Sequence, residues 1–331
     1  MIKPVRLGSF VAGLLAATAC VGMAIDAHAD ELHVMAPSPE CKTNEAGRDY
    51  CSIGEAITAA NARAGSHVIR LAHGAVYTLD RSDHDDEGGN GLPAIAGNLI
   101  IEGDGSTIER SQAKGIVPFR LFHVLPRGEL TLRQLTLRHG TTGLGFDGAA
   151  IWNRGTLTVA SCVLEDNHSG DDGGAIRSDG SLLVQDSFLR RNSALSQGRL
   201  GGVGGVGGAI QSHTQFGKGR TRIERTVFEG NQADASGGAL WLMGDTAMVQ
   251  ATVIGNRAGE RGGGIMNYGT LDLRRSRVVD NQARDAGGGI YAFGPATVAD
   301  TELTRNRAGE AGDCDGQVRG CGTNVVIGIR H

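Results

Sequence analysis

A glycine-rich tetrapeptide recurs along the chain with a period of about 25 residues, which is within the range of known solenoid repeats. Its form is Gly-Gly-Ala-Ile or a close variant, and its copies end at Ile151, Ile176, Ile210, Leu240, Ile265 and Ile290. Three of the five steps between these ends have the same length, whereas the steps from Ile176 to Ile210 and from Ile210 to Leu240 are longer. A fixed period of this size is typical of a solenoid, in which each repeat packs only on its neighbours. The repeat therefore constrains the fold more than any other feature of the sequence.

A column of asparagines gives the internal geometry of one repeat. Its members are Asn167, Asn192, Asn231, Asn256, Asn281 and Asn306. Most of them stand at one fixed distance after the end of a tetrapeptide, as Asn281 does after Ile265, and the residue three places before each one is apolar. Apolar positions that match between successive repeats indicate parallel strands stacked ~4.8 Å apart rather than hairpins. The sequence thus predicts an all-β, right-handed, single-stranded parallel β-helix of 25-residue coils, with the asparagines stacked as an amide ladder.

An open stack exposes strand edges at its ends, so we expect a cap at each end. Ser52 and Glu55 form a capping box, and the apolar residues around them lie on one helical face: Ile53, Ala56, Ile57 and Ala60. These residues predict an N-terminal capping helix within residues 30–64. The β-helix is then expected at 65–312 and a C-terminal cap at 313–331.

Five cysteines follow residue 40, and four of them lie near the two ends of the stack. The short spacings make Cys41 with Cys51, and Cys314 with Cys321, the candidate disulfides. Cys162 falls in a column of small residues and is expected to be a buried, unreactive thiol.

The first thirty residues have the pattern of a secretory signal peptide. Lys3 and Arg6 precede a nearly uncharged run from Leu7 to Ile25, and Ala27-His28-Ala29 follows. This predicts a signal peptide at 1–29, cleaved after Ala29, and an exported protein that resides outside the cell, on its surface or in the periplasm. Lipidation at Cys20 is the alternative.

No other segment of the sequence is long and apolar enough to span a membrane. Removal of Lys3, Arg6 and Asp26 with the signal peptide takes the net charge from −4 to −5. This balance does not favour nucleic acid as a partner.

The two long steps of the repeat contain insertions that suggest a first candidate site. Nine extra residues lie between Asn192 and Ile210, and five lie between Ile210 and Asn231, near the same corner of the stack. The polar residues beside this corner are Asp171, Asp172, Arg177, Asp179 and His213. Two loops could wall a groove over them, or the glycine-rich segment 198–208 could simply be a solvated excursion.

The residues that follow each tetrapeptide are expected to point outward. They are Trp152, Arg177, Gln211, Trp241, Met266 and Tyr291. Trp152, Trp241 and Tyr291 make this row unusually aromatic, which suggests a strip for contact with a carbohydrate or a protein. The alternative is ordinary stacking between neighbouring coils.

The run from Cys51 to Ile57, followed by Ala59-Ala60-Asn61, resembles the CSLREA motif that opens many exported bacterial right-handed β-helix repeat proteins. Ile53 and Gly54 replace the Leu and Arg of that motif. The glycine-Ile and Phe-x-x-Asn repeats are similar to the middle repeats of chlamydial polymorphic outer membrane proteins. The likeness covers residues 41 to 312. It implies a pectin-lyase-like fold on an exported or surface protein, in families that mostly have no assigned reaction.

Two classes of function fit these features. One is a secreted or cell-surface scaffold that binds a glycan or a surface protein along its outer face, and the other is a polysaccharide lyase or glycoside hydrolase. An enzyme of this fold is expected to place carboxylates at matched positions of adjacent coils. We find no such recurrence in the sequence, and the acidic run Asp83–Glu87 lacks the spacing of a calcium loop. We therefore favour the scaffold, assign no catalytic residue, and expect no metal or cofactor.

Overall fold

The computed structural model describes residues 30–38, 40–41, 48–195, 204–214 and 219–321. The predicted signal peptide, with both of its processing alternatives, lies outside these residues. So do most of the first insertion, part of the second, and the last ten residues of the chain.

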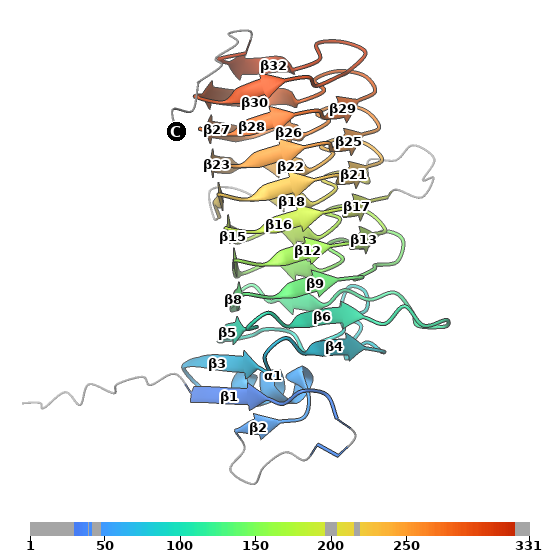
Figure 1. The fold of residues 1–331 in the computed structure, drawn as a ribbon, viewed down its shortest axis with the longest axis vertical. Helices are drawn as coiled ribbons and strands as arrows, with labels where there is room; N and C mark the ends of the chain where they lie inside the picture. Colours follow the sequence, from blue (N-terminus) through green and yellow to red (C-terminus); the bar gives the residue numbers. More distant parts are fainter. Residues whose placement is uncertain (1–29, 39, 42–47, 196–203, 215–218, 322–331) are drawn as a thin grey trace, which may run out of the picture.

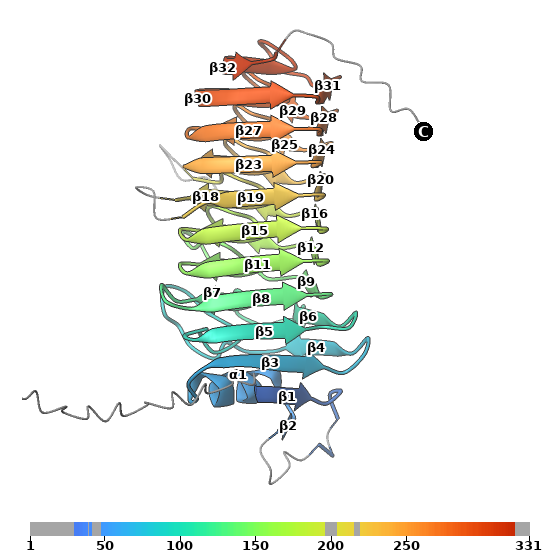
Figure 2. The same ribbon diagram turned by 90° about the vertical axis from the view of Figure 1, so that its left-hand side faces the viewer.

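Parallel strands stack in four rows along the long axis of the molecule (Figures 1 and 2). The first row consists of β7 (Phe122–Val124), β10 (Ile151–Asn153), β14 (Ile176–Ser178), β18 (Ile210–His213), β22 (Leu240–Met243), β26 (Ile265–Asn267) and the start of β30 (Ile290–Ala299). The second row consists of β1 (Asp30–Val34), β3 (Ser66–Leu71), β5 (Asn98–Glu102), β8 (Glu129–Arg133), β11 (Thr156–Ala160), β15 (Ser181–Gln185), β19 (Thr221–Glu224), β23 (Asp245–Val249), β27 (Thr270–Arg274), the end of β30, and β32 (Cys314–Arg319).

Two further rows complete each coil. The third row consists of β4 (Val76–Leu79), β6 (Thr107–Arg110), β9 (Thr136–Arg138), β12 (Val163–Glu165), β16 (Phe188–Arg190), β20 (Val227–Glu229), β24 (Thr252–Ile254), β28 (Arg277–Val279) and β31 (Glu302–Thr304). The fourth row consists of β13 (His168–Ser169), β17 (Ser193–Ala194), β21 (Gln232–Ala233), β25 (Arg257–Ala258) and β29 (Gln282–Ala283). Wherever no insertion intervenes, each residue pairs with its equivalent in the next repeat, as Ile151 does with Ile176 and Val253 with Val278. The predicted parallel β-helix and its register are therefore confirmed.

Each regular coil turns at corners that require a left-handed backbone. In the coil that ends at Asn306, these residues are Gly287, Asp300 and Arg305, with φ values of 60°, 51° and 59°. A left-handed residue between two extended segments redirects the chain, and glycine or a polar residue tolerates it best. The second glycine of each tetrapeptide has a different role. A Cβ at Gly174 would overlap the carbonyl oxygen of Gly208 in the next coil, so only glycine allows the coils to approach.

The asparagine column forms the predicted amide ladder inside the stack. Asn256 shows the pattern: its Oδ1 accepts from the backbone N–H of Asn231 at 2.8 Å and from the Asn231 Nδ2 at 2.9 Å. The Asn256 Nδ2 in turn donates to Asn281 Oδ1 at 2.9 Å and to the Phe228 carbonyl at 3.0 Å. Every member of the column is buried, so these bonds satisfy polar groups that water does not reach.

The N-terminal end is closed by α1 (Ile53–Asn61), as predicted. Ser52 caps the helix by accepting from the Glu55 N–H at 3.1 Å, and the apolar face of the helix is buried against the first coils (Figure 1). The second-row strand β1 pairs with β3, and the short strand β2 (Asp49–Tyr50) pairs with β1. Among the described residues, stacking therefore begins at Asp30, within the segment expected to precede the β-helix.

The C-terminal strand β32 extends the stack into the segment expected to be a cap, because it pairs with β30. The structure joins Cys314 to Cys321 at this end and Cys41 to Cys51 at the other, as the spacings suggest. Cys162 is a buried free thiol whose pKa is raised to about 11 by burial. In the described part of the chain, no helix is long and apolar enough to cross a membrane.

Introducing a charged side chain at a buried position of the third row tests this register. Val278 has no exposed surface, and we expect Val278→Asp to lower the free energy of unfolding by roughly 3 kcal/mol or more, because the new carboxylate has no partner there. Thermal melting and urea unfolding measure the loss. The matched control is Asp280→Asn, two residues away, where φ is 55° and the exposed ion pair with Arg305 is worth little. That control should cost less than about 1 kcal/mol, and an unchanged melting temperature in Val278→Asp would show that the register is wrong.

Candidate functional site

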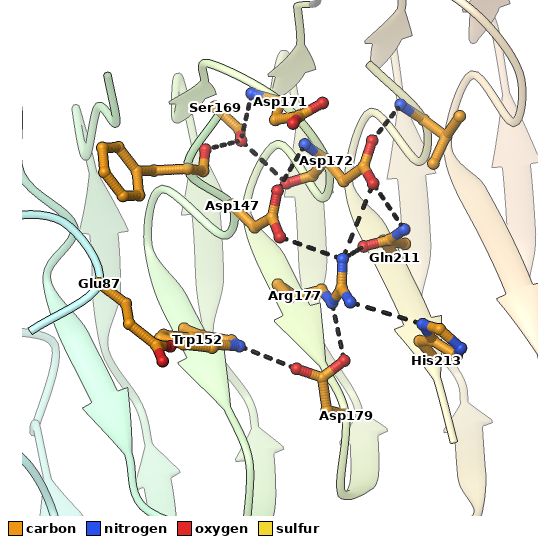
Figure 3. Close-up of polar contacts among 12 residues, drawn as sticks. Glu87, Asp147, Trp152, Ser169, Asp171, Asp172, Arg177, Asp179, Gln211 and His213 are labelled. Carbon is orange, nitrogen blue, oxygen red and sulfur yellow. Dashed lines mark hydrogen bonds and ion pairs between the residues drawn. The ribbon is translucent and has the colours of Figure 1, made fainter. Parts of the chain in front are cut away.

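A network of charged side chains covers the outer face of the first row where β10, β14 and β18 lie side by side (Figure 3). Arg177, on β14, is its centre, and only 16% of its side chain is exposed. Figure 3 shows carboxylates from the turns before β10 and β14 converging on this guanidinium from one side. Asp179 contacts it from the other.

Two of these carboxylates occupy the same position on adjacent coils. Asp147 and Asp172 each stand four residues before the first residue of their strand, and the register aligns those strands. The Asp172 N–H donates to Asp147 Oδ1 at 3.0 Å. The expectation that no carboxylates recur at matched positions is therefore wrong. Asp147 precedes the variant tetrapeptide Gly148-Ala149-Ala150-Ile151, in which alanine replaces the second glycine, so the repeat is less evident there.

Arg177 uses nearly all of its donors within the network. Its Nε donates to Asp179 Oδ1 at 2.8 Å, and Nη1 donates to Asp147 Oδ2 at 3.0 Å and also to Gln211. Its Nη2 lies 3.5 Å from the Nδ1 of His213. Burial alone would lower the pKa of Arg177, but Asp179 and Asp147 outweigh that effect and raise it. The guanidinium is therefore a fixed positive charge that orients the groups around it.

Asp172 is held by the coil that follows it. Its Oδ1 accepts from the Val206 N–H at 3.1 Å and its Oδ2 accepts from Gln211 Nε2 at 2.8 Å, while Arg177 Nη1 lies 3.7 Å from Oδ2. Burial raises the pKa of Asp172 to about 6, and the neighbouring carboxylate of Asp147 adds to the effect. Burial also raises the pKa of Asp147. Asp172 therefore exchanges its proton near neutral pH, as a candidate acid or base must.

Asp171 brings a third carboxyl group to the same place. Ligand atoms of Asp147, Asp171 and Asp172 lie within 4.8 Å of one another, which is close enough for the three to hold one metal ion. Gly204 packs against the Asp171 carboxylate so closely that a Cβ at this position would overlap it. The end of the first insertion, residues 204–206, thus forms one wall of the site.

Aromatic and imidazole rings flank the network. Trp152 donates from its Nε1 to Asp179 Oδ2 at 2.9 Å, and the ring of His123 stacks on Trp152 with centroids 4.6 Å apart. Burial, and then the charge of Arg177, lower the pKa of His213, so this side chain is neutral at pH 7. On the far side of His213 lies Trp241, with ring centroids 6.2 Å apart.

Six of the eight predicted ligand-binding residues lie in this network: Asp171, Asp172, Arg177, Asp179, His213 and Trp152. Trp241 touches its edge through His213, whereas Tyr291 lies two coils beyond Trp241 and does not join it. Sequence reasoning missed Asp147 as a site residue and did not choose Gln211. Both could have been found, since Asp147 stands one repeat before Asp172 and Gln211 is aligned with Arg177.

The aromatic members of the predicted outward row contact rings outside that row rather than one another. Trp241, Tyr268, Phe293 and Tyr291 form a continuous run of ring contacts with centroids 4.8 to 5.2 Å apart. Tyr268 and Phe293 come from the outward position two residues further along the strand, which the prediction did not include. Tyr268 and Phe293 stack across coils, yet both remain exposed, at 42% and 41%, so cross-coil stacking accounts for only part of this strip.

Removal of the central charge should destabilise the protein in a pH-dependent way. Arg177→Met leaves half-buried carboxyl groups without a countercharge, so we expect a loss of about 2–4 kcal/mol at pH 7. Without Arg177, the already raised pKa values of Asp147 and Asp172 rise further. Because their folded-state pKa values then lie above the unfolded ones, proton uptake stabilises the fold as the pH falls, and the loss should shrink at pH 5.

Urea unfolding of the parent and the variant at pH 7 and pH 5 measures both losses. Arg284→Met is the matched control, because its ion pair with Asp285 is fully exposed to solvent and is expected to contribute little to stability at either pH. A loss in Arg177→Met that is the same at both pH values would contradict the assignment of the charges.

Comparison with known proteins adds one match. Residues 225–242 match the model for the Chlamydia polymorphic membrane protein repeat, a stretch that runs from the corner before β20 into β22. The match supports the predicted likeness of the repeats. No curated protein and no solved structure gave a significant match to the chain. The likeness to the CSLREA motif and the pectin-lyase-like assignment therefore stay predictions.

Proposed function

We propose that this protein is a surface-exposed β-helix scaffold that binds a glycan at the Arg177 network. The repeat match supports a repeat protein of the outer surface, and the network gathers several partly buried charged groups on the outer face of the first row. The observation that carries the proposal is the arrangement around Arg177. Three carboxyl groups, an amide and an imidazole are held in fixed positions there by a rigid stack, with the ring of Trp152 beside them.

The chemistry of the network favours a ligand rich in hydroxyl groups. Sugar hydroxyls donate hydrogen bonds to carboxylates and amides, and the apolar faces of sugar rings pack against aromatic side chains. Because three carboxyl groups surround a single guanidinium and Asp171 adds a fourth nearby, an anionic ligand such as a phosphate would be repelled. Preorganisation matters as well, because a site fixed by backbone hydrogen bonds loses little freedom on binding.

A glycoside hydrolase is the second candidate, and the raised pKa of Asp172 favours it. A carboxyl group with a pKa of about 6 can donate a proton at neutral pH while a neighbouring ionised carboxylate acts as nucleophile or base. Asp147 and Asp171 both lie close enough to Asp172 for such a pair. We rank this function second because Val206, Gln211 and Arg177 already hold the Asp172 carboxylate in place.

A glycan array tests the proposed function. The parent should bind at least one class of glycan, and Asp171→Asn should weaken that binding about tenfold, because the isosteric amide removes one acceptor and one charge. Asp245→Asn is the matched control, since Asp245 is exposed at the start of β23 and lies outside the network. That control should bind as the parent does.

Turnover of the bound glycans, followed by reducing-end release between pH 4 and pH 8, separates the two candidates. Binding without cleavage supports the scaffold. Cleavage that declines as the pH rises through about 6 supports the hydrolase, because Asp172 would then have lost its proton. Equal binding by the parent and Asp171→Asn would place the glycan elsewhere on the surface, and a parent that binds no glycan would contradict both candidates.

A further inference from the structure

At the N-terminal end of the stack, the second row of strands extends further than the third row. β4 is the N-terminal strand of the third row, and it lies in the same coil as β3. The second row continues beyond β3 with β1 and then β2 (Figure 2). Among the described residues, no third-row strand accompanies β1. The edge of β4 that faces this level is therefore open.

The backbone groups of β4 that face the open level follow from its pairing with β6. The Thr107 N–H donates to the Ala75 carbonyl at 2.8 Å, and the Ser111 N–H donates to the Leu79 carbonyl at 2.7 Å. Alternate residues of a parallel strand point their N–H and C=O groups to opposite neighbours. The groups of Val76 and Thr78 therefore point away from β6. Within the described part of the chain, no backbone group pairs with them.

A cavity of about 430 Å³ lies along this open edge. It is lined by residues 76–83 of β4 and the turn after it, by Ser52–Gly54 at the start of α1, by Gly91–Pro93, and by Pro37. The helix lies at this level of the stack (Figure 1), and among the described residues no strand pairs with this edge of β4. Gly54 helps to keep the cavity open, since the nearest atom to a Cβ at this position would be Pro93 Cδ at 3.6 Å.

We propose that this cavity receives an extended segment of a partner protein, which adds to β4 as a further strand of the third row. An open row of N–H and C=O groups beside a cavity is the geometry of strand addition, in which main-chain hydrogen bonds supply affinity and alternate side chains supply specificity. The fold already uses the same pairing at every other level of the row.

The alternation along β4 defines the chemistry of the partner segment. Tyr77 is buried, whereas Val76 is 45% exposed and Thr78 is exposed. Side chains of paired strands align, so the residue opposite Tyr77 enters the cavity beside Leu92 and Ile53, and its neighbours face solvent. The partner segment is therefore an uncharged strand of about five residues with β-branched apolar residues at alternate positions.

Peptide binding with hydrogen exchange tests this inference in the full chain. The probe is a panel of acetylated and amidated five-residue peptides of the form Thr-Val-Thr-Ile-Thr, in which the two apolar positions are varied over Val, Ile, Leu and Phe. In the free protein the amides of Val76 and Thr78 should exchange fast and that of Tyr77 slowly. At least one peptide should bind and slow the exchange of Val76 and Thr78, and N-methylation of its two apolar residues, whose N–H groups would bond to β4, should abolish that effect.

Two glycine variants separate occupation of the cavity from a general effect. Gly54→Arg places a long side chain in the cavity at a helical position, where most residues are more stable than glycine, and should weaken the best peptide about tenfold or more. Gly97→Arg is the matched control, because Gly97 is exposed and a Cβ there meets nothing within 4 Å. It should leave the affinity unchanged.

Three results would overturn the inference. One is that no peptide of the panel slows the exchange of Val76 and Thr78. Another is that these two amides are already protected in the free monomer, which would mean that the chain fills its own cavity. The last is protection that appears only as the protein concentration rises, with dimers in sedimentation, since the occupant would then be a second copy.

Discussion

The hydrogen bonds between equivalent residues of successive coils are the constraint on which the rest of this structure depends. These bonds restrict the register between coils most strongly at the asparagine ladder, where each side chain binds both the backbone and the side chain of its neighbour. These groups are buried, so a coil that slipped by one residue would leave several polar atoms without partners. A slip would also turn the apolar residues of every strand toward solvent. The ladder and the core therefore enforce the same register.

That register explains why like charges meet at the Arg177 network. Residues at equal positions on adjacent coils are neighbours ~4.8 Å apart, whatever their chemistry. Asp147 and Asp172 are brought together in this way. Burial raises the pKa of both, and the Asp147 carboxylate adds to the rise at Asp172. Arg177 offsets part of the cost by bonding Asp147 and Asp179. This arrangement lies on the outer face and adds nothing to the apolar core, which is why we propose a role in binding for it.

The periodic parts of the structure were predictable because the spacing of the repeat specifies which residues pair between successive coils. The strands, the asparagine ladder and the capping helix follow from residue spacing and from Ser52 and Glu55 alone. The same spacing could have identified Asp147, since it stands one repeat before Asp172. It precedes a tetrapeptide in which alanine replaces the second glycine, which makes the repeat harder to recognise there. The contacts of Val206 with Asp172 were not predictable, because an insertion has no repeat to specify its path.

The two ends of the stack show what happens where the periodic pairing stops. At the C-terminal end, Asp313 takes the place of the next asparagine and accepts from the Asn306 N–H at 3.1 Å and Nδ2 at 3.0 Å, so the ladder ends without an orphaned group. At the N-terminal end, Asn167 Oδ1 accepts from the backbone N–H of Gly140, and the ladder ends there. The strand rows do not end so uniformly, because α1 replaces the core contacts of a further coil but none of its backbone hydrogen bonds. A helix can seal the hydrophobic interior of a β-helix, yet it cannot pair with a strand edge, so the edge of β4 keeps the capacity to bind an extended chain.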